Sequence, residues 1–259
     1  MSRDLLRDEE RKMKQDTLAT EIKKENLVLR KNASLAAWFW FASSSIFIIA
    51  TLASVLDVPI NQALDLTMLR SFVTQITLGK FLAIQTLGAL IVAIAINKIR
   101  RISYATLILL IALISLAAPI FESHSASGGS HLVAIGTLIV HVIALSMWVG
   151  GLLAILISNE LDRKIALQRF SQLAFWAAIA VVTSGAINAW IRMNFAAAWK
   201  GSYAILIAEK IILTLLLLII AAIVRRKLVG NVSKLIAVES AVMVLTILIG
   251  TLLSQSKPP

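Results

Sequence analysis

The polar and apolar positions of this 259-residue chain are arranged in long blocks, without the two-residue alternation of a half-buried strand. Seven blocks are apolar and long enough to cross a hydrocarbon core of roughly 30 Å, which takes about 20 helical residues. They lie near residues 33–56, 75–97, 102–121, 131–157, 170–192, 203–224 and 235–253. The pattern therefore predicts seven membrane-spanning helices.

The predicted fold class is all-α, a polytopic transmembrane helix bundle. The apolar blocks are rich in Ala, Ile and Leu and are joined by short connections, which is not the pattern of a membrane β-barrel. Composition agrees, because 59% of the residues are hydrophobic, 15% are charged and the mean hydropathy is +0.87. Soluble domains carry about 25% charged residues, so this chain is predicted to have the lipid bilayer as its surroundings.

The basic residues indicate an orientation. Of the 25 Lys and Arg residues, 19 fall in alternate connections, at residues 1–32, 98–101, 158–169 and 225–234, and four fall in the opposite loops and tail. By the positive-inside rule the N-terminus is cytoplasmic and the C-terminus is outside. The net charge of +11 then reflects membrane topology, and nucleic acid is not a predicted partner.

Residues 1–32 differ from the remainder of the chain. They contain nine basic and seven acidic side chains and lack the apolar core of a signal peptide. We interpret them as a charged, helical cytoplasmic segment, followed by the transmembrane bundle at 33–259. A solvated helix and a regulatory or partner-binding segment both stay open for residues 1–32.

All three histidines lie in one part of the chain. In the predicted orientation His141 lies ten residues inside the fourth span, roughly 15 Å from its outer end. An ionisable side chain at that depth is costly and often marks a ligand or ion path. The alternative is a neutral imidazole that forms a hydrogen bond between helices.

The other two histidines, His124 and His131, flank the flexible stretch SASGGS on the outer side. Imidazole suits copper, zinc and iron, whereas the methionine thioether favours Cu(I). Met193 lies at the outer end of a span and Met147 lies within one, although a single methionine is more typical of packing than of a metal site. The chain has no cysteine, which excludes thiolate metal sites and disulfides.

The fourth span also carries a packing motif. Trp148 follows His141 by seven residues and shares nearly the same helical face. Gly150 and Gly151 provide a surface without side chains, where a neighbouring helix can approach closely. We predict that they pack against the fifth span around residues 184–185.

Three charged residues lie within the last two spans and are candidates for structural or coupling roles. Glu209 and Lys210 are adjacent, about 100° apart around the helix, so they cannot both face one partner. Glu239 lies near the inner end of the seventh span, where it could reach the basic cytoplasmic rim or have a functional role.

The stretch HVIALSMWVGG at 141–151 resembles a signature of the copper resistance protein D family, a His followed seven residues later by Trp-x-Gly-Gly. Downstream, Ser184-Gly185 resembles the Ser-Gly pair of the next helix, and the resemblance places Lys210 on a family lysine and Glu239 on a family acid. The likeness covers about residues 35–259 and is most secure over 120–259. It is greatest to the copper-resistance half of actinobacterial fusions with a cytochrome c oxidase assembly module.

The resemblance implies copper handling at the cytoplasmic membrane of a bacterium, by uptake or by tolerance together with a periplasmic copper-binding protein. A non-transporting partner that delivers copper to an oxidase-assembly module is an alternative. A haem-binding electron carrier is another, although bis-His ligation needs histidines on two spans. No ATP-binding loop is visible, so copper that crosses the membrane would move by facilitated or ion-coupled transport. We expect a protein that is not an enzyme, with copper of undetermined oxidation state as its cargo.

Overall fold

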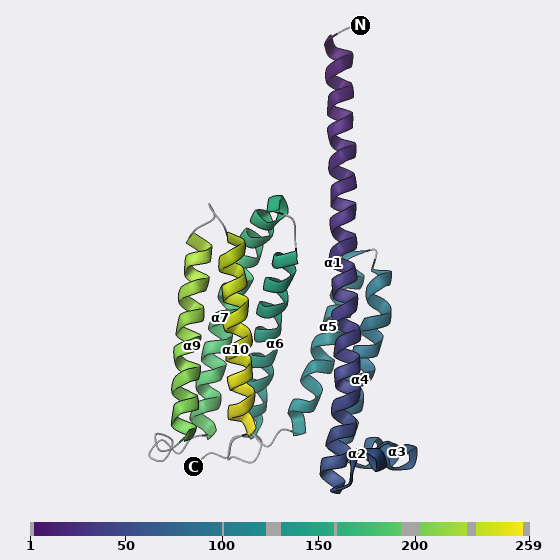
Figure 1. The fold of residues 1–259 in the computed structure, drawn as a ribbon, viewed down its shortest axis with the longest axis vertical. Helices are drawn as coiled ribbons and strands as arrows, with labels where there is room; N and C mark the ends of the chain where they lie inside the picture. Colours follow the sequence, from purple (N-terminus) through teal and green to yellow (C-terminus); the bar gives the residue numbers. More distant parts are fainter. Residues whose placement is uncertain are drawn as a thin grey trace.

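The computed structural model describes residues 3–99, 101–122, 131–157, 160–192, 202–226 and 232–255. These residues are almost entirely helical and contain no strand. The predicted all-α class is therefore confirmed, and the long helices form two groups that lie side by side (Figure 1).

The first group consists of α1 (Arg3–Leu56), α4 (Thr77–Ala95) and α5 (Ile102–Ala117). Two short helices, α2 (Ile60–Ala63) and α3 (Leu66–Gln75), precede α4, and 3-10 turns follow α4 at Ile96–Lys98 and α5 at Ala118–Glu122. The second group consists of α6 (His131–Ile157), α7 (Glu160–Arg192), α9 (Ser202–Arg226) and α10 (Val232–Gln255).

Helix α1 joins the predicted cytoplasmic segment to the first span without a break. It contains 54 residues, which corresponds to roughly 80 Å, so its first half projects well beyond the other helices (Figure 1). The expected helical character of residues 1–32 is confirmed for its backbone from Arg3 onward.

A turn at the far end of α1 explains where this helix stops. Asp57 has a left-handed backbone with φ of 53°, and the N–H of Val58 donates to the carbonyl of Ala53 at 3.0 Å. This is the hydrogen bond of a Schellman cap, and Pro59 follows it, where helix cannot continue. Asp65 is the N-cap of α3, and its carboxylate accepts hydrogen bonds from the N–H groups of Thr67 and Met68 at 2.6 and 3.2 Å.

Close packing around α4 holds the first group together, with α1, α3 and α5 against it. Leu52, Phe72 and Leu82 are nearly inaccessible and form one core cluster. A Cβ placed on Gly88 would lie 1.8 Å from Ser115 Oγ, and one on Gly79 would lie 2.2 Å from the carbonyl oxygen of Phe72. Neither position has room for any side chain.

Within the described residues, six helices are long and apolar enough to cross a membrane. They correspond to six of the seven predicted spans, at Leu27–Leu56, Thr77–Lys98, Ile102–Glu122, Leu132–Ile157, Ala166–Ile191 and Lys234–Leu252. The one remaining predicted span, residues 203–224, coincides with α9, which packs along α10. The total of seven and the orientation relative to the membrane stay predictions.

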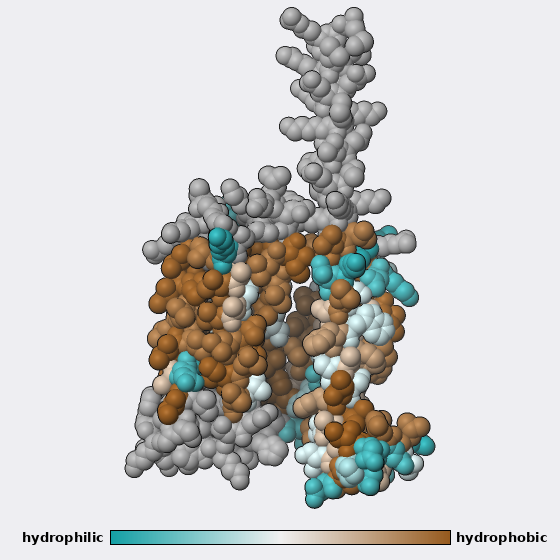
Figure 2. All heavy atoms as spheres, viewed as in Figure 1, coloured by the Kyte–Doolittle hydropathy of each residue, from teal (hydrophilic) through white to brown (hydrophobic). Residues whose placement is uncertain are grey.

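The outer surface of both groups suits a bilayer. Large apolar side chains are exposed along every long helix, and Figure 2 shows hydrophobic residues over most of the described surface in view, with hydrophilic ones mainly near the ends. Threonine hydroxyls in the helices donate to the carbonyl four residues earlier, as at Thr86, Thr106 and Thr246. Such internal hydrogen bonds are what hydrocarbon surroundings require.

The two groups meet through a small apolar contact. Ala117 and Ile120 at the end of α5 pack with Ile135 on α6, and Leu138, Ile139 and Val142 adjoin them. The second group has its own larger core, formed by residues from α6, α7, α9 and α10. Each group is therefore a helix bundle in its own right, and the three histidines belong to the connection between the groups and to the second group.

Candidate functional site

His141 lies inside the second group, at the interface between α6 and α7. Its Nδ1 is 3.1 Å from the carbonyl oxygen of Val181 and 3.1 Å from Ser184 Oγ. Gly185, on the same turn of α7, gives the ring room, because a Cβ there would lie 3.3 Å from His141 Cε1. The fourth span therefore meets the fifth around residues 184–185 through His141, and not through Gly150 and Gly151 as predicted.

These contacts define which nitrogen of His141 is free for chemistry. The carbonyl of Val181 can only accept, so Nδ1 must carry the proton that forms this hydrogen bond. The Ser184 hydroxyl donates to the carbonyl of Ala180, which leaves its oxygen to accept from Nδ1 as well. In a neutral ring Nε2 then holds the lone pair, and both contacts of the ring to described residues are through Nδ1.

A second polar pair lies one helical turn outward. Thr137 Oγ1 donates to Asn188 Oδ1 at 2.8 Å, and the two residues lie four positions from His141 and Ser184 respectively. The α6–α7 interface therefore carries two successive polar contacts in the half that contains the N-terminal part of α6. Sequence reasoning missed this pair, because a lone Thr and a lone Asn in apolar runs give no signal of facing each other.

The adjacent charges on α9 point in different directions, as predicted. Lys210 is partly buried, and its Nζ lies 3.5 Å from the position that a Cβ on Gly250 of α10 would occupy. Glu209 is exposed.

The core of the second group also contains Trp148, and Glu239 is buried on α10. Glu239 is 2% exposed and lies on α10 between Ile236 and Met243, which are 0% and 1% exposed. Trp148 is 3% exposed and belongs to the same core cluster as Met243. Among the described residues, its Nε1 has no hydrogen-bond partner.

The predicted packing of the two glycines is half right. A Cβ on Gly151 would lie 2.1 Å from Cε2 of Phe170 on α7, so Gly151 does pack against the fifth span, but nearly four turns from residues 184–185. Gly150 has no atom within 4 Å of its Cβ position and is exposed, so its predicted packing is wrong. Consecutive helical residues point about 100° apart, and only one of them can face α7.

The remaining predicted metal ligands are not brought to His141 by the described structure. His124 and Met193 lie outside the described residues, as does the side chain of His131. Met147 lies on α6 six residues from His141, which places it about 120° around the helix. Within the described part of the chain, no group of three or more His, Asp or Glu residues is arranged to hold a metal ion.

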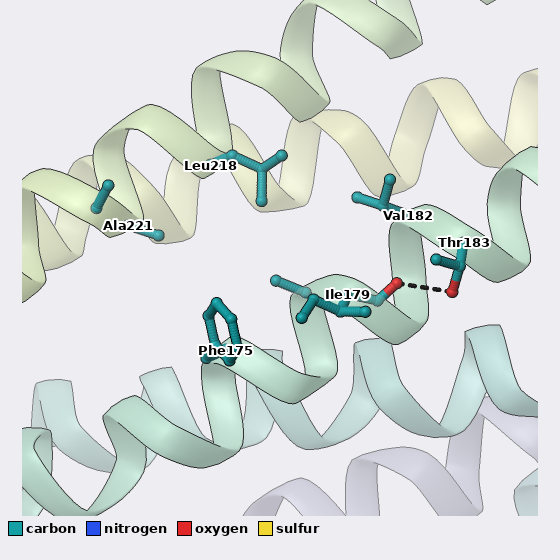
Figure 3. Close-up of a pocket in the computed structure, with 8 residues that line it drawn as sticks. Phe175, Ile179, Val182, Thr183, Leu218 and Ala221 are labelled. Atoms are coloured by element: carbon teal, nitrogen blue, oxygen red, sulfur yellow. Dashed lines mark hydrogen bonds between the residues drawn. The ribbon is translucent and has the colours of Figure 1, made fainter.

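An apolar groove lies between α7 and α9, and its lining is not typical of a metal-binding site. Phe175, Ile179 and Val182 line one wall and Leu218 and Ala221 the other (Figure 3). Its hydroxyl group, on Thr183, donates to the carbonyl of Ile179 at 2.8 Å. The residues that line this groove include no imidazole, thioether or carboxylate, so the polar interior near His141 is the stronger candidate site.

The fold and the site together define a class, a multi-pass helical membrane protein with ionisable groups inside one of its two bundles. Two family models match the chain, copper resistance protein D over residues 164–253 and the copper resistance protein D-like N-terminal domain over residues 17–132. The chain belongs to the copper resistance protein D family, and its role is in copper resistance or copper handling. Neither curated proteins nor solved structures give a significant match.

Proposed function

We propose that this protein moves copper across the cytoplasmic membrane of a bacterium and that His141 is the deep relay on the path. The family match supports copper as the cargo. The observation that carries the relay is the hydrogen bond from His141 Nδ1 to the carbonyl of Val181, which leaves Nε2 as a ligand atom. Metal-ligating histidines commonly donate their second N–H to a backbone carbonyl, which fixes the tautomer and orients the ring.

The surroundings of His141 favour this role over helix bridging alone. A histidine that only bridges two helices would need the contacts of its Nδ1 to α7. The lone pair on its Nε2 would then have no role inside the membrane. Imidazole nitrogen and thioether sulfur are both ligands of Cu(I). Met243 supplies a thioether from α10, 12 residues from the outer end of that helix, or roughly 18 Å, at a depth similar to that of His141.

The outer histidines and Met193 fit the first stage of the same path. His124 and His131 would capture copper at the outer membrane surface, with Met193 as a further soft ligand, and pass it to His141. No described contact bears on this stage, so it rests on sequence position. A periplasmic copper-binding protein is the partner that such a surface site would receive copper from.

Uptake into proteoliposomes tests the relay. His141→Ala should abolish accumulation of Cu(I) while binding at the surface persists. His141→Ala leaves Ser184 bonded to its own helix, so the protein should still fold, and a thermal melt in detergent checks this. The double variant His124→Ala/His131→Ala should weaken uptake at low copper and spare it at high copper. Normal copper uptake by a well-folded His141→Ala protein would contradict the proposed relay role of His141.

The same assay distinguishes transport from the alternative function, which is delivery of copper to an oxidase-assembly module without transport. A delivery protein would bind copper through His141 without accumulating it inside vesicles. Wild-type protein that binds copper stoichiometrically and transports none would therefore support delivery instead. A strong Soret band in the visible spectrum of the purified protein would support the hypothesis of a haem-binding electron carrier.

A further inference from the structure

The groove between α7 and α9 has a volume of about 360 Å³ and is partly open to the side of the second group. Figure 3 shows Ile179 and Val182 of α7 across the groove from Leu218 and Ala221 of α9. Helix α7 packs closely along α6, and α9 packs along α10, whereas α7 and α9 contact each other much less. Ligand pockets range from roughly 300 to 1,000 Å³, so the groove is large enough to hold a ligand.

The groove lies at the middle of the span that α7 forms. Within the span Ala166–Ile191, Phe175 is nine residues from one end and Thr183 is eight residues from the other, which correspond to roughly 13 and 12 Å. In a hydrocarbon core about 30 Å thick, the groove is then surrounded by acyl chains. This depth is the same for either orientation of the protein in the membrane.

The lining of the groove excludes water and polar ligands. Among the described residues that line it, Thr183 alone is polar, and its hydroxyl donates to the carbonyl of Ile179 on the same helix at 2.8 Å. An ordered water needs about two to four polar partners, which this lining does not offer. The occupant of the groove is therefore apolar.

The walls of the groove favour a hydrocarbon chain over a helix of another protein. Helices that associate in a membrane bring small residues together, so that their backbones approach closely. Here the α7 wall is made of Phe175, Ile179 and Val182, which are 47%, 39% and 39% exposed, and the small residues Ala178 and Ala221 are buried beneath. Bulky walls above buried alanines form a slot that suits an extended chain better than a helix roughly 10 Å across.

We propose that this groove binds one acyl chain of a membrane phospholipid, which lies along α7 and α9. In the groove the chain gains dispersion contacts on several sides, which a chain on the convex outer surface of a helix lacks. The inference does not depend on the proposed role of His141. It does add a support for that site, because Val182 and Thr183 line the groove on the face of α7 opposite to Val181 and Ser184, which contact His141.

Photocrosslinking in vesicles tests the proposal. The protein is reconstituted in phosphatidylcholine with a small fraction of phosphatidylcholine that carries a diazirine near the methyl end of one acyl chain, and mass spectrometry maps the labelled residues. Leu218 and Ile219 are adjacent on α9, but Leu218 lines the groove, whereas Ile219 does not and is 58% exposed. A chain bound in the groove should label Leu218 more strongly than Ile219. Stronger labelling of Ile219, as expected for lipid at the general surface, overturns the proposal.

A variant that fills the groove sharpens the test. Ala222 is exposed and lines the groove, so Ala222→Phe should remove most of the labelling of Leu218 and leave that of Ile219 unchanged. The matched control, Ala186→Phe, adds the same ring at an exposed position of α7 outside the groove and should change neither. Unchanged labelling of Leu218 in a folded Ala222→Phe protein overturns the proposal.

Two further outcomes also decide. If Ala222→Phe does not fold, the ratio of Leu218 to Ile219 labelling in the wild-type protein is sufficient. A wild-type protein that is dimeric in the vesicles and unlabelled at Leu218 would assign the groove to a second copy of the chain and overturn the binding of lipid. Neither outcome changes the copper-uptake test of His141, so the two proposals fail separately.

Discussion

The two helix groups both expose apolar side chains as expected in lipid, but they differ in the polar and ionisable side chains that they contain in their interiors. Among the residues of the first group whose side chains the structure describes, from Leu27 onward, the buried polar side chains are Ser44 and Ser115, and every charged side chain is exposed or partly buried. The second group buries Glu239, partly buries His141 and Lys210, and pairs Thr137 with Asn188. Ionisable groups inside a membrane protein are costly, so the buried Glu239 and the partly buried His141 support our proposal that the copper chemistry lies in the second group.

The largest loss of stability is expected at Gly88 in the first group, where a side chain would overlap its neighbours. Gly88→Ala should destabilise the protein by about 3 kcal/mol, because the new Cβ would overlap Ser115 Oγ and Cβ. Thermal melts in detergent measure the loss. The double variant Gly88→Ala/Ser115→Gly removes the overlapping atoms and should recover much of it. A Gly88→Ala protein as stable as wild type would show that the first group is not tightly packed.

The adjacent glycines of α6 test whether the second group depends on close packing at its inner end. Gly151→Leu should cost about 2 kcal/mol, because Phe170 occupies the space. Gly150→Leu is the matched control, with open surroundings, and should melt like wild type. Equal melting temperatures for the two variants would contradict the observed orientation of α6.

A buried serine in each group gives the sharpest functional contrast. Ser184→Ala removes a contact to His141 Nδ1 and should lower copper uptake about tenfold, the lower end of effects from residues that orient metal ligands. Ser115→Ala changes a similarly buried serine in the first group and should leave uptake unchanged. If both variants lose uptake equally, the division of roles between the groups is wrong.

Much of this arrangement was predictable from sequence. Long apolar runs predicted the helices, and the depth of His141 within one run marked it as unusual. The register between helices was not predictable, because it depends on which face of α6 meets α7. That is why Gly150 was predicted to pack and does not, and why the Thr137–Asn188 contact was missed. The short helices α2 and α3 escaped notice because a capped ten-residue helix resembles an ordinary polar connection.

The smallest effect is expected at α3, outside the membrane. Hydrogen bonds from the backbone N–H groups of Thr67 and Met68 lower the pKa of Asp65 below its usual value of 3.8. A lowered folded-state pKa means that the cap stabilises α3 fully above pH 3.8 and loses that effect as the pH falls through the folded value. Hydrogen exchange should show constant protection of the α3 amides from pH 7 to about pH 5 and weaker protection near pH 3.

The Asp65→Ala variant should reduce that protection at neutral pH and leave copper uptake unchanged, since the first group is assigned to packing. A loss of uptake in this variant, with α6 and α7 still protected from exchange, would move part of the function into the first group.

The central claim is that Nε2 of His141 binds the cargo inside the second group. X-ray absorption of Cu(I)-loaded protein in the His124→Ala/His131→Ala background tests it directly, because His141 is then the one histidine left in the chain. The account predicts about one bound copper per chain with imidazole scattering, and loss of that copper when His141→Ala is added. Copper that stays bound without an imidazole ligand, or a background protein that binds none, would contradict it.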